Sequence, residues 1–110
     1  MVQDEVGRPV SGHGFDTWHY RSTTPMSVKK LRQAIRALPG DIYRCKGFVV
    51  DAKDPAVRTV LQSVGRRTTV AVDDAWGAGP ARTDLVVIGA AGAIDQESLQ
   101  ATFDGCRTTK

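Results

Sequence analysis

Several features that mark nucleotide hydrolases and membrane proteins are missing from this chain of 110 residues. It contains no G-x-x-x-x-G-K segment, so it has no phosphate-binding P-loop. No apolar run approaches the roughly 20 residues that cross a bilayer. Residues 1–5 include two acids and no apolar run, so we expect no secretory signal and a soluble, cytoplasmic protein.

Cysteine and histidine, the usual zinc ligands, are scarce. Cys45 and Cys106 lie far apart without a Cys-x-x-Cys spacing, which predicts buried thiols rather than a disulfide framework or a zinc knuckle. His13 and His19 are the only imidazoles. Zinc binding by His19 with Asp16 or Cys45 would require the first two predicted strands to be neighbours. A weak metal site that uses these histidines or cysteines is therefore the last of three functional hypotheses.

The charge balance is only mildly basic. Fifteen Lys and Arg against twelve Asp and Glu give a net charge of +3, and acids and bases alternate along most of the chain. Nucleic-acid-binding proteins usually cluster their cations, so this distribution favours a solvated surface over an RNA-binding groove. The length suffices for one domain with its own core.

Apolar periodicity and turn residues predict five strands and two helices. We expect strands at residues 15–21, 42–50, 58–64, 67–72 and 85–88. Ser27 is the expected N-cap of an amphipathic helix that ends before Pro39-Gly40, and Asp95 is the expected N-cap of a second helix. The unbroken apolar run at 85–88 is typical of a strand covered on both faces. Residues 73–82 are a predicted loop with Trp76 at its centre.

This order predicts an α+β fold with two layers. A mainly antiparallel sheet of about five strands would carry both helices on one face. The helical link between the first two strands would permit a parallel pair, as in ferredoxin-like folds. Residues 1–14 are expected to form a flexible lead-in or linker, and residues 15–107 the domain.

Arg44 and Lys46 give the strongest indication of a binding surface. Side chains alternate along a strand, so both cations should share one face with Ile42 and Phe48. The other face is predicted to hold Tyr43, Cys45 and Val49. If that second set meets the helices, the uncovered face carries a basic, partly aromatic patch. Such a patch is either a solvated sheet face or a docking surface for another domain or an anion.

Two short motifs only partly match known signatures. Residues 87–92 retain G-x-x-G of the dinucleotide-binding G-x-G-x-x-G, and Asp95 would put negative charge beside a phosphate. A plain strand-to-helix turn is expected there. Lys46-Gly47-Phe48 begins like an RNA-recognition segment, but Val50 offers no ring on which a base could stack. A small nucleic-acid-binding module is therefore the alternative function, although nucleic acid is not the expected partner.

Several segments together resemble the C-terminal domain of CobW-type proteins, which are GTP-dependent metal chaperones and insertases. They are G-F at 14–15, L-P-G-D-I-Y-R-C-K-G-F at 38–48, L-Q-S-V-G-R-R at 61–67, Trp76, T-D-L-V-V-I-G at 83–89, I-D-Q-E-S-L at 94–99 and F-D-G-C at 103–106. Each segment is short, and their order and spacing make the set specific. The P-loop, the magnesium site and the Cys-x-Cys-Cys metal motif of that family have no counterpart in this sequence.

The resemblance implies a non-catalytic regulatory or protein-interaction domain, with no cofactor of its own. GTP, magnesium and a transition metal such as zinc or cobalt are implied for a separate N-terminal domain of the family. The implied partners are a CobW-type GTPase domain, in the same chain or another, and a client metalloprotein in metal homeostasis or cobalamin biosynthesis. Arg, Trp and other aromatic residues are enriched at interfaces, so we name Arg44, Lys46, Phe48 and Trp76 as candidate contact residues.

Overall fold

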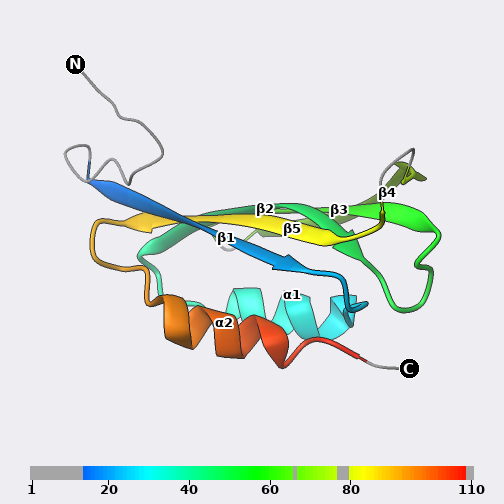
Figure 1. Cartoon of the computed structure of the whole chain (residues 1–110). Coiled ribbons are helices and arrows are strands. Elements are labelled where there is room, and N and C mark those ends of the chain that lie inside the picture. Colours follow the sequence, from blue (N-terminus) through cyan, green and yellow to red (C-terminus); the bar gives the residue numbers. More distant parts are fainter. Residues whose placement is uncertain (1–13, 66, 77–79, 109–110) are drawn as a thin grey trace, which may run out of the picture.

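The computed structural model describes residues 14–65, 67–76 and 80–108 and arranges them in two layers (Figure 1). One layer is a five-stranded sheet and the other holds two helices, both on the same face of that sheet. In chain order the elements are β1 (Phe15–Ser22), α1 (Val28–Arg36), β2 (Ile42–Val50), β3 (Val57–Val64), β4 (Arg67–Ala75), β5 (Thr83–Ala90) and α2 (Gln96–Asp104). The predicted α+β class is confirmed, whereas residues 1–13 of the predicted lead-in lie outside the described residues.

The strand order is β1-β5-β2-β3-β4, and every hydrogen-bonded pair of strands is antiparallel. The first two strands are therefore not neighbours, although the helical link between them would have permitted a parallel pair. The last strand, β5, lies between them and pairs with both. This insertion turns the β1-α1-β2 unit into a split version of the βαβ motif.

The core lies between the sheet and the helices. Its helix residues are Leu31, Ile35, Leu99 and Phe103, and its strand residues are Tyr20, Cys45, Val49, Leu61, Leu85 and Val87. The Tyr20 and Phe103 rings meet edge to face with centroids 5.2 Å apart, and Tyr20 Oη donates to Asp104 Oδ1 at 2.9 Å. An aromatic pair of this geometry adds about 0.5–1.5 kcal/mol beyond its buried area. This contact therefore fixes α2 against β1.

Both predicted helix caps are confirmed. Ser27 Oγ accepts a hydrogen bond from the Lys30 amide, and Asp95 Oδ1 accepts one from the Ser98 amide. Each cap satisfies one of the amides that a helix start leaves without a partner. Neither helix in the described part of the chain is long and apolar enough to span a bilayer.

The prediction that the apolar run of β5 is covered on both faces was wrong. Along β5 the residues alternate between buried and half-buried, and the half-buried ones, such as Val86 and Ile88, face away from the helices. A central strand is shielded laterally by its two neighbouring strands, so apolar residues can occupy its uncovered face. The predicted loop at 73–82 was also too long, because β4 continues to Ala75.

A β-bulge near the start of β2 overturned another prediction. The register with β5 shifts between Ile42 and Arg44, so Tyr43 is the extra residue. Ile42 consequently packs against the core, and Tyr43 is 47% exposed, the reverse of their predicted positions. One inserted residue is enough because side chains alternate with a period of two.

Gly47 allows β2 and β5 to approach each other closely. Its φ of 151° is one that residues with a side chain rarely adopt. A Cβ atom added there would lie 2.0 Å from the Asp84 carbonyl oxygen, which is backbone and cannot rotate away. The glycine in Lys46-Gly47-Phe48 is therefore required by strand pairing.

We expect Gly47→Ala to destabilise the domain by at least about 2–3 kcal/mol, because the methyl group clashes with β5 and the backbone is strained. Gly40→Ala is the matched control, since a Cβ at Gly40 meets nothing within 4 Å, and it should change stability by less than about 1 kcal/mol. Urea unfolding measures both. Equal stability of the two variants would contradict the role given to Gly47.

We also expect the free energy of unfolding to fall as pH rises above about 9. Burial raises the pKa of the Cys45 thiol to about 12 and raises the pKa of Cys106. Burial and the bond to Asp104 raise the pKa of Tyr20 to about 12. The folded state keeps these groups protonated while the unfolded chain ionises, so the stability present below pH 9 is lost progressively toward pH 12.

Chemical unfolding at a series of pH values, on the wild type and on Cys45→Ala, tests this expectation. The variant should lose stability less steeply than the wild type between about pH 9 and 10.5, whatever its absolute stability. Identical slopes would show that Cys45 does not contribute to the pH dependence.

Candidate interaction surface

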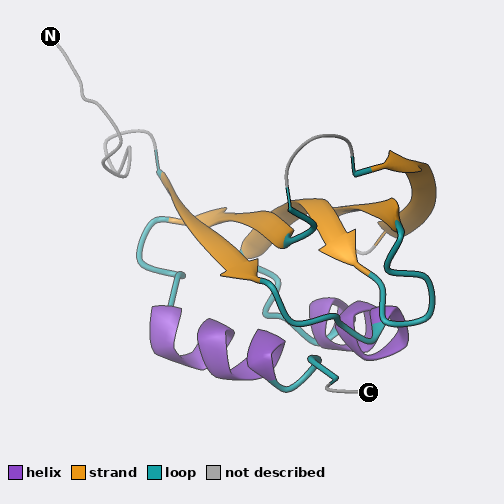
Figure 2. Ribbon diagram, turned by 45° about the vertical axis from the view of Figure 1, so that its right-hand side comes forward, coloured by secondary structure: helices purple, strands orange, loops and turns teal. Residues whose placement is uncertain are grey.

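The sheet face directed away from α1 and α2, called here the open face, carries no helix (Figures 1 and 2). At its centre Arg44 lies between Ile88 of β5 and Val64 of β3, and Lys46 lies between Val86 and Gln62. Residues directly opposite across a sheet point to the same side. The two cations therefore stand among half-exposed apolar side chains, as predicted from strand alternation.

Arg44 and Lys46 have no ion-pair partner among the described residues. Arg67 of β4, which faces Val64 across the sheet, adds a third exposed cation. Two acids of this face are paired with other cations of the same face: Asp84 Oδ2 accepts from Arg21 Nε at 3.3 Å, and Asp73 pairs with Arg58. The centre of the open face is therefore positively charged, and its charges are available to a partner.

Phe48 shares this face and is 38% exposed. The Arg58 guanidinium lies 4.5 Å from the centroid of the Phe48 ring and also pairs with Asp73 of β4. A cation over a ring is worth about 0.5–1 kcal/mol at an exposed site. One face of the ring is thus covered by the guanidinium.

Trp76 does not join these three residues. It directly follows β4, and its Nε1 donates to the Pro55 carbonyl oxygen at 3.0 Å. This bond ties the end of β4 to the connection between β2 and β3. The structure thus brings Arg44, Lys46 and Phe48 together on one face and holds Trp76 beyond the end of β4. A contact role for these four residues stays a prediction.

The open face also carries exposed apolar residues that were not predicted from the sequence. Tyr43, Val64 and Phe15 are all more than a third exposed. Strand alternation could have identified Phe15 and Val64, because their neighbours Trp18, Tyr20, Leu61 and Ser63 face the helices. Tyr43 could not have been found this way, since the bulge reverses its side.

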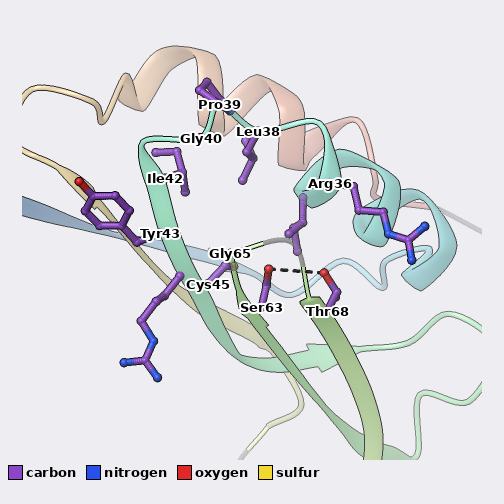
Figure 3. A pocket seen from close by; sticks show the side chains of 12 residues that line it. Arg36, Leu38, Pro39, Gly40, Ile42, Tyr43, Cys45, Ser63, Gly65 and Thr68 are labelled. Atoms are coloured by element: carbon purple, nitrogen blue, oxygen red, sulfur yellow. Dashed lines mark hydrogen bonds between the residues drawn. The ribbon is translucent and has the colours of Figure 1, made fainter.

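A hollow of about 500 Å³ lies on the helix side of the sheet, at the carboxyl end of α1 (Figure 3). Leu38, Ile42 and Cys45 give it an apolar wall. Its polar lining includes Arg36 and the Ser63 and Thr68 hydroxyls, which lie 3.4 Å apart. Tyr43 points away from it. Because burial raises the Cys45 pKa to about 12, that thiol is protonated at neutral pH and is a poor nucleophile or metal ligand.

The zinc hypothesis finds no support in the geometry. Cys45 is buried on the helix side of β2, whereas His19 lies on the open face of β1, and β5 separates the two strands. The described residues contain no group of three or more His, Cys, Asp or Glu that could hold a metal ion. His13 lies outside the described residues.

Comparisons with known proteins agree with this architecture. A crystal structure of the Zn(II)-bound YjiA GTPase from E. coli, and one of a Zn(II)-bound triple mutant of YjiA, each match with a TM-score of 0.71 and 21% sequence identity. Each match covers 86% of this chain but only 30% of the YjiA chain, so it shows a shared fold over part of a larger protein. No curated protein sequence matches the chain.

A family model described as the C-terminal domain of the cobalamin synthesis protein CobW matches residues 15–107. This match spans all seven structural elements, from β1 to the end of α2. The chain therefore belongs to the CobW C-terminal domain family.

Proposed function

We propose that this chain is a non-catalytic interaction domain that docks on the GTPase domain of a CobW-type metallochaperone, or on its client, through the open face. The observation that carries the proposal is the set of exposed cations without ion-pair partners, Arg44, Lys46 and Arg67, on a described sheet face that no helix covers. Arg44 and Arg67 lie beside Val64, which is itself exposed. A partner surface with acids and apolar groups would use both.

The proposal assigns nucleotide and metal binding to another domain of the CobW family. The GTPase fold, magnesium and a transition metal such as zinc or cobalt would belong to a separate domain, since this sequence has no P-loop. The proposed clients are metalloproteins of metal homeostasis or cobalamin biosynthesis. The proposed location is the cytoplasm, whose reducing conditions suit the free thiols of Cys45 and Cys106.

Nucleic acid fits the open face less well than protein does. Single strands bind by stacking successive bases on aromatic rings. The ring of Phe48 is partly covered by Arg58, and the neighbouring strands place Asp84 and Val60 beside it. These neighbours include a negative charge and no second ring, which favours a protein partner.

Charge reversal on the open face tests the docking surface. We expect Arg44→Glu with Lys46→Glu to weaken binding to a CobW-type GTPase domain by about tenfold or more, because two attractions become repulsions. Isothermal titration calorimetry measures the affinity. Both side chains are exposed, so the fold should be preserved, which thermal unfolding checks.

Lys29→Glu with Lys30→Glu is the matched control. It lowers the net charge by the same four but lies on α1, in the helix layer. The docking proposal requires this variant to bind the GTPase domain like the wild type. Equal affinity of the open-face variant and the wild type would remove the open face from the interface.

We also expect no GTP hydrolysis by this chain alone in the presence of magnesium. The reason is the missing P-loop, without which no backbone cradle holds the phosphates. A phosphate-release assay on the purified chain, with a CobW-type GTPase domain as positive control, measures it. GTP hydrolysis that co-purifies with the chain through successive purification steps would contradict a non-catalytic role.

A further inference from the structure

Helix α1 carries a second concentration of positive charge, and this one belongs to the helix layer. Four of its nine residues are cations, Lys29, Lys30, Arg32 and Arg36, and none is an acid. On an amphipathic helix, charged residues usually lie on the side that faces solvent. The structure places these four cations opposite the turn that follows β2.

Helix α1 and the turn after β2 form the two walls of a groove of about 720 Å³, to which Ser27 and Thr108 also contribute. The groove is lined by five cations, the four of α1 and Lys53, and by a single acid, Asp51. None of the five cations has an ion-pair partner among the described residues. The Asp51 carboxylate accepts from the Lys53 backbone amide at 3.0 Å, which occupies it in the turn.

The groove accounts for the whole positive excess of the chain. It holds five of the fifteen cations and one of the twelve acids, so the rest of the chain has ten cations and eleven acids. Charge gathered on one surface while the remainder is balanced creates a local field that attracts anions. The net charge of +3 alone conceals this distribution.

Backbone hydrogen bonds hold the groove walls in place. The Met26 amide donates to the Val50 carbonyl oxygen at 2.8 Å, and the Ala52 amide donates to the Met26 carbonyl oxygen at 2.9 Å. The Ser27 amide donates to the Cys106 carbonyl oxygen at 2.8 Å. The start of α1, the turn after β2 and the C-terminal segment are thereby joined at Met26, which is fully buried. A preformed surface of this kind binds without a large ordering cost.

We propose that this groove binds an acidic polypeptide segment of a partner protein. Lys29, Arg32 and Arg36 follow one another at i, i+3 and i+7, which places them along one side of α1 over about 10 Å. Carboxylates at the same spacing on a helix, or alternate ones on an extended segment, match this length. The groove therefore has the charge and the reach for three or four acidic side chains.

Two features favour an acidic peptide over nucleic acid. The groove has no aromatic residue on which a base could stack. Its five cations are also fewer than the roughly 6–10 phosphate contacts of a strongly salt-dependent DNA-binding protein. The aliphatic stems of the cations, with Val28 and Ala52, give apolar contacts that a peptide can use.

This site is distinct from the open face and does not depend on the proposed docking there. The two surfaces belong to opposite layers of the molecule (Figures 1 and 2). The domain can therefore hold one partner on the sheet and an acidic segment on α1 at the same time.

Fluorescence anisotropy with a labelled synthetic peptide tests the proposal. The probe carries glutamates at i, i+3 and i+7, and its control has glutamines in their place. We expect the wild type and the variant R44E/K46E to bind the glutamate probe within about twofold of each other, and K29E/K30E to bind about tenfold more weakly. The glutamine peptide should bind none of the three measurably.

The two double variants both lower the net charge from +3 to −1, so they separate a local site from a general charge effect. K29E/K30E puts acids in the first turn of α1, where the helix dipole favours them, so folding should survive. Lys53→Glu changes the opposite wall and should weaken binding about threefold without touching the helix.

Equal loss of peptide binding in both double variants would show a net-charge effect and overturn the proposal. A second result would also overturn the proposal: a short duplex DNA binds the wild type more tightly than the peptide does, and this DNA binding is lost in K29E/K30E. The groove would then be a phosphate site. Weakening by K29E/K30E and Lys53→Glu, with R44E/K46E intact, supports the acidic-peptide site.

Discussion

The pairing of β5 with two strands is the constraint on which the structure depends. The last strand enters between β1 and β2 and is hydrogen-bonded to both. Leu85 and Val87 then point into the core beneath the helices, while Val86 and Ile88 point to the opposite side. The pairing with β2 requires Gly47, because any larger residue meets the β5 backbone. Gly47 thus permits the strand pairing that places Arg44 beside Ile88 and Lys46 beside Val86 on the open face.

With the sheet aligned this way, the two layers have different surfaces. The sheet side mixes cations with exposed apolar groups, as at Arg44 and Val64. The helix side carries the charge excess of the chain along α1. Arg36 borders both the α1 groove and the hollow at the carboxyl end of that helix. Two such surfaces are what the proposed role as an interaction domain requires.

Local sequence signals predicted most of the fold. Ser27 and Asp95 cap helices because short side chains with an oxygen reach the first free amides, and this needs no information from elsewhere in the chain. Alternation along β2 likewise placed Arg44, Lys46 and Phe48 on one face. The features of the two surfaces that could not be predicted involve contacts between distant segments. The bulge that reverses Tyr43 depends on the register with β5, and the groove depends on Lys53 meeting α1 from another part of the chain.

The proposed docking places the GTPase partner on the open face of the sheet. Chemical-shift mapping of the isotope-labelled chain, titrated with an unlabelled CobW-type GTPase domain, locates the contact residue by residue. We expect shifts at the amides of Arg44, Lys46 and Ile88, with the amides of α1 and α2 unchanged. Shifts confined to the two helices would contradict it.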